Sequence, residues 1–197
     1  MDTFRTIAAE AQGIYKEKGS KFMAFAFPVK TEDEAVKKID MLRKKYYDAR
    51  HHCYAYRLGC NGELYRANDD GEPTNTAGKP ILGQLLAFDI SNVVVVVVRY
   101  FGGILLGTGG LIQAYKKASE NALNNAEILT DIVTDTFSVS FDYSELNHVL
   151  KIIKDMNLKC FEQDFGMNCS MKITARKSLS EQLEKRLKTL KSLRVES

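Results

Sequence analysis

The most prominent hydrophobic pattern in the chain is a run of six valines at residues 93–98. Alternate side chains of a strand point to opposite faces, so a strand built from this run is apolar on both faces. Such a strand is typical of the centre of a sheet that is covered on both sides. Residues 21–29 and 49–59 also alternate and predict two further strands, the second closed by a turn at "CNGEL".

Three segments have the periodicity of amphipathic helices. Residues 31–47 begin at Thr31, which we expect to cap the helix, and run from acidic to basic residues as the helix dipole favours. A second helix is expected after Thr76, its N-cap, with Pro80 in the first turn. A third is expected to continue to about residue 125, because its apolar positions form one stripe: Leu111, Ala114, Tyr115, Ala118 and Ala122.

A second structural unit is predicted from about residue 128. It consists of a strand, a helix capped by Ser144, a hairpin across Gly166, another helix and a short last strand. The corresponding ranges are 131–143, 144–156, 158–166 with 167–176, 178–191 and 193–196. The order β-α-β-β-α-β is that of a ferredoxin-like domain. We therefore expect an α+β protein with one domain at residues 1–127 and a smaller one at residues 128–197.

Composition and charge place few limits on the partner. The chain of 197 residues has 28 Lys and Arg against 25 Asp and Glu, a net charge of +3, which does not by itself require nucleic acid. The longest apolar run is far shorter than the roughly 20 residues of a membrane-spanning helix, and the N-terminus lacks the apolar stretch of a secretory signal. The four cysteines follow no pairing pattern, so we expect reduced thiols, a cytoplasmic location and no membrane association.

The segment "RYFGGILLGTGGL", residues 99–111, places five glycines in front of the third helix. The amides of Gly107, Thr108, Gly109 and Gly110 are expected at the N-terminus of that helix, where unpaired N–H groups and the helix dipole favour a phosphate. The alternative is that the glycines allow the strand, the turn and the helix to pack closely. The spacing matches neither a Walker loop nor a Rossmann fingerprint.

Three carboxylates lie close together in "NDDGEPTNTAGKP": Asp69, Asp70 and Glu72. Carboxylate oxygens can hold Mg²⁺, which a phosphate can share, while a turn followed by a helix cap is the alternative. We expect this loop to face the glycine segment across a ligand-binding cleft. The expected cleft residues are Asp69, Asp70, Gly71, Glu72, Thr76, Gly78 and Lys79. No metal ligand is assigned.

The adjacent histidines His51 and His52 point to opposite faces of the strand that contains them. His51 and Cys53 share a face, but no third residue is evident that would orient such a pair for nucleophilic catalysis. We therefore expect a packed histidine and a buried thiol, and we assign no catalytic residue.

Several longer motifs together resemble the YigZ/IMPACT family. They are "KGSKF", "DARHHCYAYR", "DDGEPTNTAGKPIL", "VVVVRYFGGILLGTGGL" and "AYKKA", within residues 16–120. The resemblance implies a first domain like the second domain of ribosomal protein S5. It implies a second domain like the last domain of translation elongation factor G. It also implies a role in translation, because eukaryotic relatives compete for an activator of a stress-responsive initiation-factor kinase.

The chain departs from this resemblance at two positions. Many relatives carry lysine at the position of Leu105 and a basic residue at that of Gln113. A phosphate bound here would therefore rely on backbone amides and on the basic residues that remain nearby. The phosphate-binding residues that we predict are Arg99, Gly102, Gly103, Gly107, Thr108, Gly109, Gly110, Lys116 and Lys117.

These observations predict a translation-associated regulatory protein without chemistry of its own. Its expected partner is RNA, the ribosome, a translation factor or another regulatory protein. One alternative is an enzyme that acts on a phosphorylated small molecule, with Asp70 and Glu72 positioning Mg²⁺ or a proton. Another is a domain that only binds proteins. No cofactor is expected unless Mg²⁺ accompanies the phosphate, and the oligomeric state is not predicted.

Overall fold

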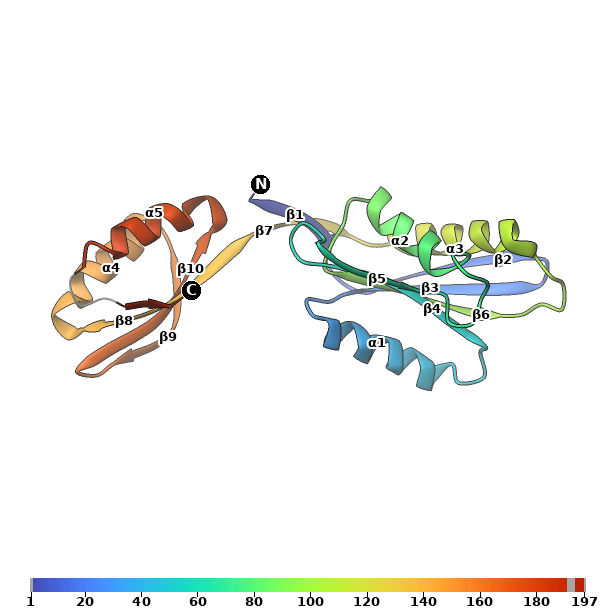
Figure 1. Cartoon of the computed structure of the whole chain (residues 1–197), viewed down its shortest axis with the longest axis horizontal. Coiled ribbons are helices and arrows are strands. Elements are labelled where there is room, and N and C mark those ends of the chain that lie inside the picture. Colours follow the sequence, from blue (N-terminus) through green and yellow to red (C-terminus); the bar gives the residue numbers. More distant parts are fainter. Residues whose placement is uncertain (1, 191–193, 197) are drawn as a thin grey trace. The chain divides into compact units, whose positions relative to one another are not determined.

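The computed structural model describes residues 2–190 and 194–196 and divides into two compact units of mixed α/β structure (Figure 1). The first unit spans Phe4–Asp131. The second runs from Ile132 onward and includes the start of the chain up to Thr3.

The first unit is built on a five-stranded sheet in which every neighbouring pair is antiparallel. In spatial order its strands are β2 (Ala11–Glu17), β3 (Ser20–Pro28), β6 (Val93–Tyr100), β4 (His51–Leu58) and β5 (Leu64–Asn68). The valine run forms β6 at the centre of this sheet, as the sequence predicted.

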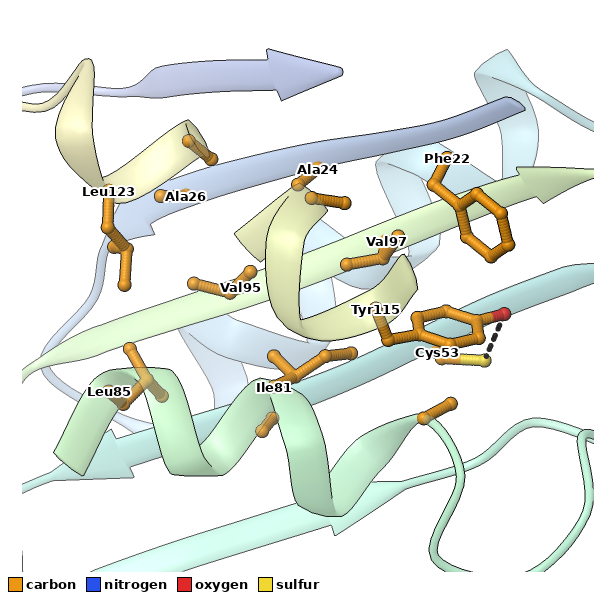
Figure 2. Packing of buried hydrophobic residues seen from close by; sticks show 14 of the residues in the cluster. Phe22, Ala24, Ala26, Cys53, Ile81, Leu85, Val95, Val97, Tyr115 and Leu123 are labelled. Carbon is orange, nitrogen blue, oxygen red and sulfur yellow. Dashed lines mark hydrogen bonds between the residues drawn. The ribbon is translucent and has the colours of Figure 1, made fainter. Parts of the chain in front are cut away.

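Helices cover both faces of this sheet, which explains the six valines. Helix α1 (Glu32–Lys45) lies on one face, and α2 (Gly78–Ala87) and α3 (Gly107–Asn124) lie on the other (Figure 1). The even-numbered valines of β6 belong to the core beneath α1, and the odd-numbered ones to the core beneath α2 and α3. Figure 2 shows this second core, in which Tyr115 of α3 meets the ring of Phe22 edge to face.

Two strands at the edges of the sheet, and a separate pair, were not predicted. β2 turns into β3 through Lys18 and Gly19, both at positive φ, and β5 is exposed along almost its whole length. β1 (Thr3–Ile7) pairs with β7 (Ile128–Ile132) in a two-stranded sheet. These strands bury few side chains, so they leave a weak hydrophobic pattern in the sequence.

Of the two helix caps predicted in the first unit, one is confirmed and one is wrong. Thr31 Oγ1 accepts a hydrogen bond from the Glu34 amide at 3.2 Å, as expected for α1. Thr76 does not cap α2, because its hydroxyl donates to the carbonyl of Pro73 at 2.6 Å. Asp69 Oδ1 accepts instead from the amides of Ala77 and Gly78, at 2.9 and 2.8 Å. The carboxylate of Asp69, which lies in the preceding loop, therefore accepts from the first amides of α2 in place of the Thr76 hydroxyl.

The second unit has its elements in the expected order. They are β8 (Thr134–Asp142), the 3₁₀ turn η1 (Tyr143–Glu145), α4 (Leu146–Asp155), β9 (Lys159–Phe165), β10 (Asn168–Arg176), α5 (Lys177–Leu187) and β11 (Arg194–Glu196). The strands form an antiparallel sheet in the order β11-β8-β10-β9. The predicted cap Ser144 is wrong: it lies inside η1, and no side chain caps α4. The expected helix end at residue 191 and strand start at residue 193 lie outside the described residues.

None of the helices in the described residues is both long enough and apolar enough to cross a membrane. The cysteines Cys53, Cys60, Cys160 and Cys169 are all free.

The face beneath α1 contains a buried histidine that makes stability depend on pH. Burial lowers the pKa of His52, an effect that the nearby Asp70 carboxylate opposes and Arg43 reinforces. The ring atom Nε2 is buried and has no partner among the described residues. The folded protein therefore resists protonation of this ring, whereas the unfolded chain accepts a proton near pH 6.5.

We expect the free energy of unfolding to fall as the pH is lowered from about 7.5 to about 5.5. His52→Leu should remove part of this dependence, because leucine does not titrate and Nε2 has no hydrogen bond to lose. Urea unfolding followed by circular dichroism at several pH values measures the effect. The control Val36→Ala alters an exposed side chain of α1 that does not titrate and should leave the dependence unchanged. Equal behaviour of the two variants would contradict the assignment to His52.

Candidate functional site

The first unit contains a cavity of about 400 Å³ where the segment before β4, the loop after β5, the end of β6 and the start of α3 meet. Its polar lining residues are Arg50, His51, Glu72, Arg99 and Thr108. The rest of the lining is Pro73, Phe101, Leu105, Leu106, Gly107 and Leu111. The cavity therefore combines cationic side chains with a largely apolar wall.

A buried ion pair joins the loop to the central strand at this cavity. Arg99 Nη1 lies 2.5 Å from Glu72 Oε1, and the two side chains are only 7% and 4% exposed. Tyr115 donates its hydroxyl proton to the same oxygen at 2.8 Å. The guanidinium of Arg99 also lies over the rings of Phe22 and Phe101. Buried charges persist only when they are paired and hydrogen-bonded, and these contacts meet that requirement.

A thiol and a phenol extend this network away from the cavity. Cys53 Sγ lies 3.3 Å from the Tyr115 hydroxyl oxygen (Figure 2) and 3.0 Å from the Asp69 carbonyl oxygen. Burial raises the pKa of the Cys53 thiol and of the Tyr115 phenol far above their usual ranges. Cys53 is thus the buried thiol that the sequence predicted, and it remains protonated, which is the wrong state for a nucleophile.

The acidic loop uses two of its three carboxylates to hold itself in place. Asp69 accepts from three backbone amides, those of Asn75, Ala77 and Gly78. Asp70 accepts from the His52 amide at 2.7 Å and from Arg43 at 3.1 Å. Within the described part of the chain, no group of three or more His, Cys, Asp or Glu side chains is arranged to hold a metal ion. Mg²⁺ at this loop stays a prediction, with Glu72 as the carboxylate that lines the cavity.

His51 lies against this loop at the rim of the cavity. Its Nδ1 is 2.8 Å from the carbonyl oxygen of Asp70, which can only accept, so Nδ1 donates its proton there. Nε2 then faces Glu72 Oε1 at 4.0 Å. We expected a packed histidine, but the ring lines the cavity because Gly71, at positive φ, turns the loop over it.

Helix α3 presents its N-terminus to the cavity through Gly107 and Thr108. No side chain caps this end, so the first amides of the helix keep their donor capacity. The two interpretations of the glycines apply to different residues. A Cβ on Gly102 would lie 1.9 Å from the carbonyl carbon of Gly19, so Gly102 allows close packing. A Cβ on Gly109 would meet nothing within 4 Å.

The structure brings together four of the predicted ligand and cleft residues: Arg99, Glu72, Gly107 and Thr108. The predicted lysines do not line the cavity. Lys116 and Lys117 are exposed on α3, and Lys117 lies over the ring of Tyr15. The remaining predicted residues also lie outside the cavity lining: Gly102, Gly103, Gly109, Gly110, Asp69, Asp70, Gly71, Thr76, Gly78 and Lys79.

The sequence suggests Arg50 and Phe101 only as members of a basic and aromatic set around the glycine segment, and it does not assign Arg50 or the apolar wall to the site. Arg50 directly precedes β4, and the wall comes from Phe101, Leu105, Leu106 and Leu111. Phe101 and Leu105 are exposed, and Leu105 is 83% exposed. Exposed large apolar side chains next to a glycine-rich segment are a signal that could have indicated a binding surface.

Comparison with known proteins gives consistent matches. Residues 18–123 match the Impact N-terminal domain. IMPACT family member YigZ of Escherichia coli is 31% identical over 167 residues, which cover 84% of this chain and 82% of YigZ. A Saccharomyces cerevisiae relative, protein IMPACT homolog, is 38% identical over 95 residues, covering 46% of this chain and 36% of the yeast protein. A crystal structure described as a hypothetical protein is 28% identical, with a TM-score of 0.77 over 99% of this chain and 97% of that one.

The glycines near the cavity allow a direct test of their two roles. Gly102→Ala should lower the free energy of unfolding by about 1–3 kcal/mol or more, since the new methyl group overlaps the backbone of Gly19 and Ser20. Gly109→Ala has open space and lies in a helix, so it should raise stability by up to about 1 kcal/mol. Urea unfolding of both variants provides the measurement. A similar loss for both would mean that the first turn of α3 also requires glycine for packing.

Proposed function

Because this chain belongs to the IMPACT family, we propose that it is a translation-associated regulatory protein that binds RNA, alone or on a ribosomal or translation-factor surface, and carries out no chemistry of its own. One observation supports the binding role above the others. The cavity brings Arg50, Arg99 and the uncapped N-terminus of α3 to the same place.

The charges at the cavity favour an anionic ligand. Glu72 is the carboxylate of the lining, and Arg99 pairs with it directly. Arg50 and the partial positive charge of the α3 N-terminus then remain to attract an anion. Phosphate is the anionic group that nucleic acids present in every nucleotide, and Phe101 at the rim offers an aromatic surface on which a base can stack.

The buried network supports binding rather than catalysis. The thiol of Cys53 and the phenol of Tyr115 are both held in their protonated forms by burial. Glu72 Oε1 already accepts hydrogen bonds from Arg99 and Tyr115, so this oxygen is engaged within the protein. The position of Glu72 on the cavity lining is the observation that favours the alternative, an enzyme for a phosphorylated small molecule.

We also propose finer assignments for the two units. The helix-covered antiparallel sheet of the first unit supports the domain type of ribosomal protein S5. The element order and the sheet order of the second support a ferredoxin-like domain. Four free cysteines support a reducing compartment, the cytoplasm.

RNA binding should be measured by fluorescence anisotropy with a short single-stranded RNA at several salt concentrations. Contact with phosphates predicts that affinity falls steeply as salt rises. Arg50→Ala should weaken binding about 10-fold and reduce the salt slope by about one. Lys44→Ala is the matched control, because it removes the same charge from an exposed position of α1, on the opposite face of the sheet.

Three results would contradict this proposal. Binding that is insensitive to salt would exclude a phosphate-based contact. Equal affinities of Arg50→Ala and Lys44→Ala would place the binding surface outside the cavity. Turnover of a phosphorylated compound that Glu72→Gln abolishes, with binding retained, would establish the enzyme instead.

A further inference from the structure

We propose that the cavity recognises a single nucleotide that carries a terminal phosphate monoester, the chemistry found at a phosphorylated RNA end and in a free nucleotide. This inference rests on the proposed function and specifies the ligand of the same site. It distinguishes recognition of an end from recognition of a continuous strand.

The size of the cavity favours an end. Its volume of about 400 Å³ lies within the range of pockets that enclose one small molecule. A protein that follows a continuous single strand uses instead an extended groove that holds several nucleotides. A cavity of this size can take one nucleotide, but not several successive nucleotides of a strand.

The charge of the cavity favours a monoester over a diester. A phosphate monoester carries about −1.5 to −2 charges at neutral pH, while each internal phosphate of a strand carries about one. Arg50 and the α3 N-terminus together supply positive charge that Glu72 does not neutralise. The monoester, which carries more negative charge, therefore gains more electrostatic stabilisation at this site than a diester does.

Arg99 gives an independent indication that the cavity offers hydrogen-bond donors to a ligand. Its side chain is 93% buried, as its 7% exposure shows, and it lines the cavity beside the first turn of α3. Glu72 occupies Nη1, but Nε is buried without a hydrogen-bond partner among the described residues. A guanidinium has five N–H donors, more than the contact with Glu72 uses, and Arg99 lines the cavity, so an anion there can accept from this residue.

The apolar wall requires more than a phosphate. Phe101, Leu105, Leu106 and Leu111 line the cavity, and a phosphate ion alone would leave them in contact with water. A nucleotide base can cover these apolar side chains. The Phe101 ring, which already lies near the Arg99 guanidinium, can stack on the face of the base. The combination of an anionic group and a planar apolar body identifies a nucleotide.

The test compares three RNA decamers of one sequence with the full chain at one salt concentration. One decamer carries a 5′-phosphate, one a 3′-phosphate and one hydroxyls at both ends. We expect at least one phosphorylated decamer to bind about 10-fold more tightly than the hydroxyl form. Arg50→Ala should abolish this advantage, and Lys44→Ala should keep it. A nucleoside monophosphate and inorganic phosphate serve as competitors, and only the nucleotide should compete effectively.

The outcomes separate this inference from the function on which it rests. Equal, salt-sensitive binding of all three decamers would overturn end recognition and leave RNA binding intact. Binding of the nucleoside monophosphate without binding of any RNA would support the ligand chemistry, assign it to a free nucleotide and overturn the RNA function. Competition by inorganic phosphate as strong as by the nucleotide would overturn the role of the apolar wall. Absence of binding by every probe would overturn both proposals.

Discussion

The buried ion pair between Arg99 and Glu72 constrains how the first unit can be assembled. Arg99 ends the valine strand on the face that α3 covers, so its charge lies where an apolar residue would be expected. Glu72 and Tyr115 meet it there, and one carboxylate oxygen joins β6, the loop after β5 and α3. Loss of one partner from such a pair typically costs about 3–5 kcal/mol, so these three segments hold one another in place.

The loop that carries Glu72 is organised for this contact. Asp69 fixes the loop to the start of α2, and Asp70 fixes it to β4 and Arg43. Three neighbouring acidic residues that resemble a metal-binding cluster in the sequence therefore divide into two structural residues and one that lines the cavity. The loop side of the cavity is thus held by several hydrogen bonds, an arrangement that would favour affinity for a ligand because little conformational freedom would be lost on binding.

Hydrophobic periodicity predicted the elements that bury side chains, because the period directly reflects which positions face a core. It predicted β6, the stripe of α3 and the order of the second unit. It did not predict β5, which is almost wholly exposed, or β1, which buries only Thr6 and Ile7. Thr76 was preferred as a cap because it stands next to the helix, whereas Asp69 reaches the same amides through a folded loop. The residues that line the cavity come from four separate segments of the chain. No local sequence pattern indicates that Arg50 and Glu72 line the same cavity.

The pairing of β2 with β3 has a consequence for how this family is divided into domains. The segment that matches the family, residues 18–123, begins after β2 and ends before β7. Yet β2 is hydrogen-bonded along β3, and Gly13 approaches α3 so closely that a Cβ would lie 2.3 Å from the Ala122 amide nitrogen. A fragment trimmed to the matching segment would expose an unpaired strand edge and the flank of α3, and such edges promote aggregation. The compact unit that contains this sheet, Phe4–Asp131, is longer at both ends than the segment that matches the family.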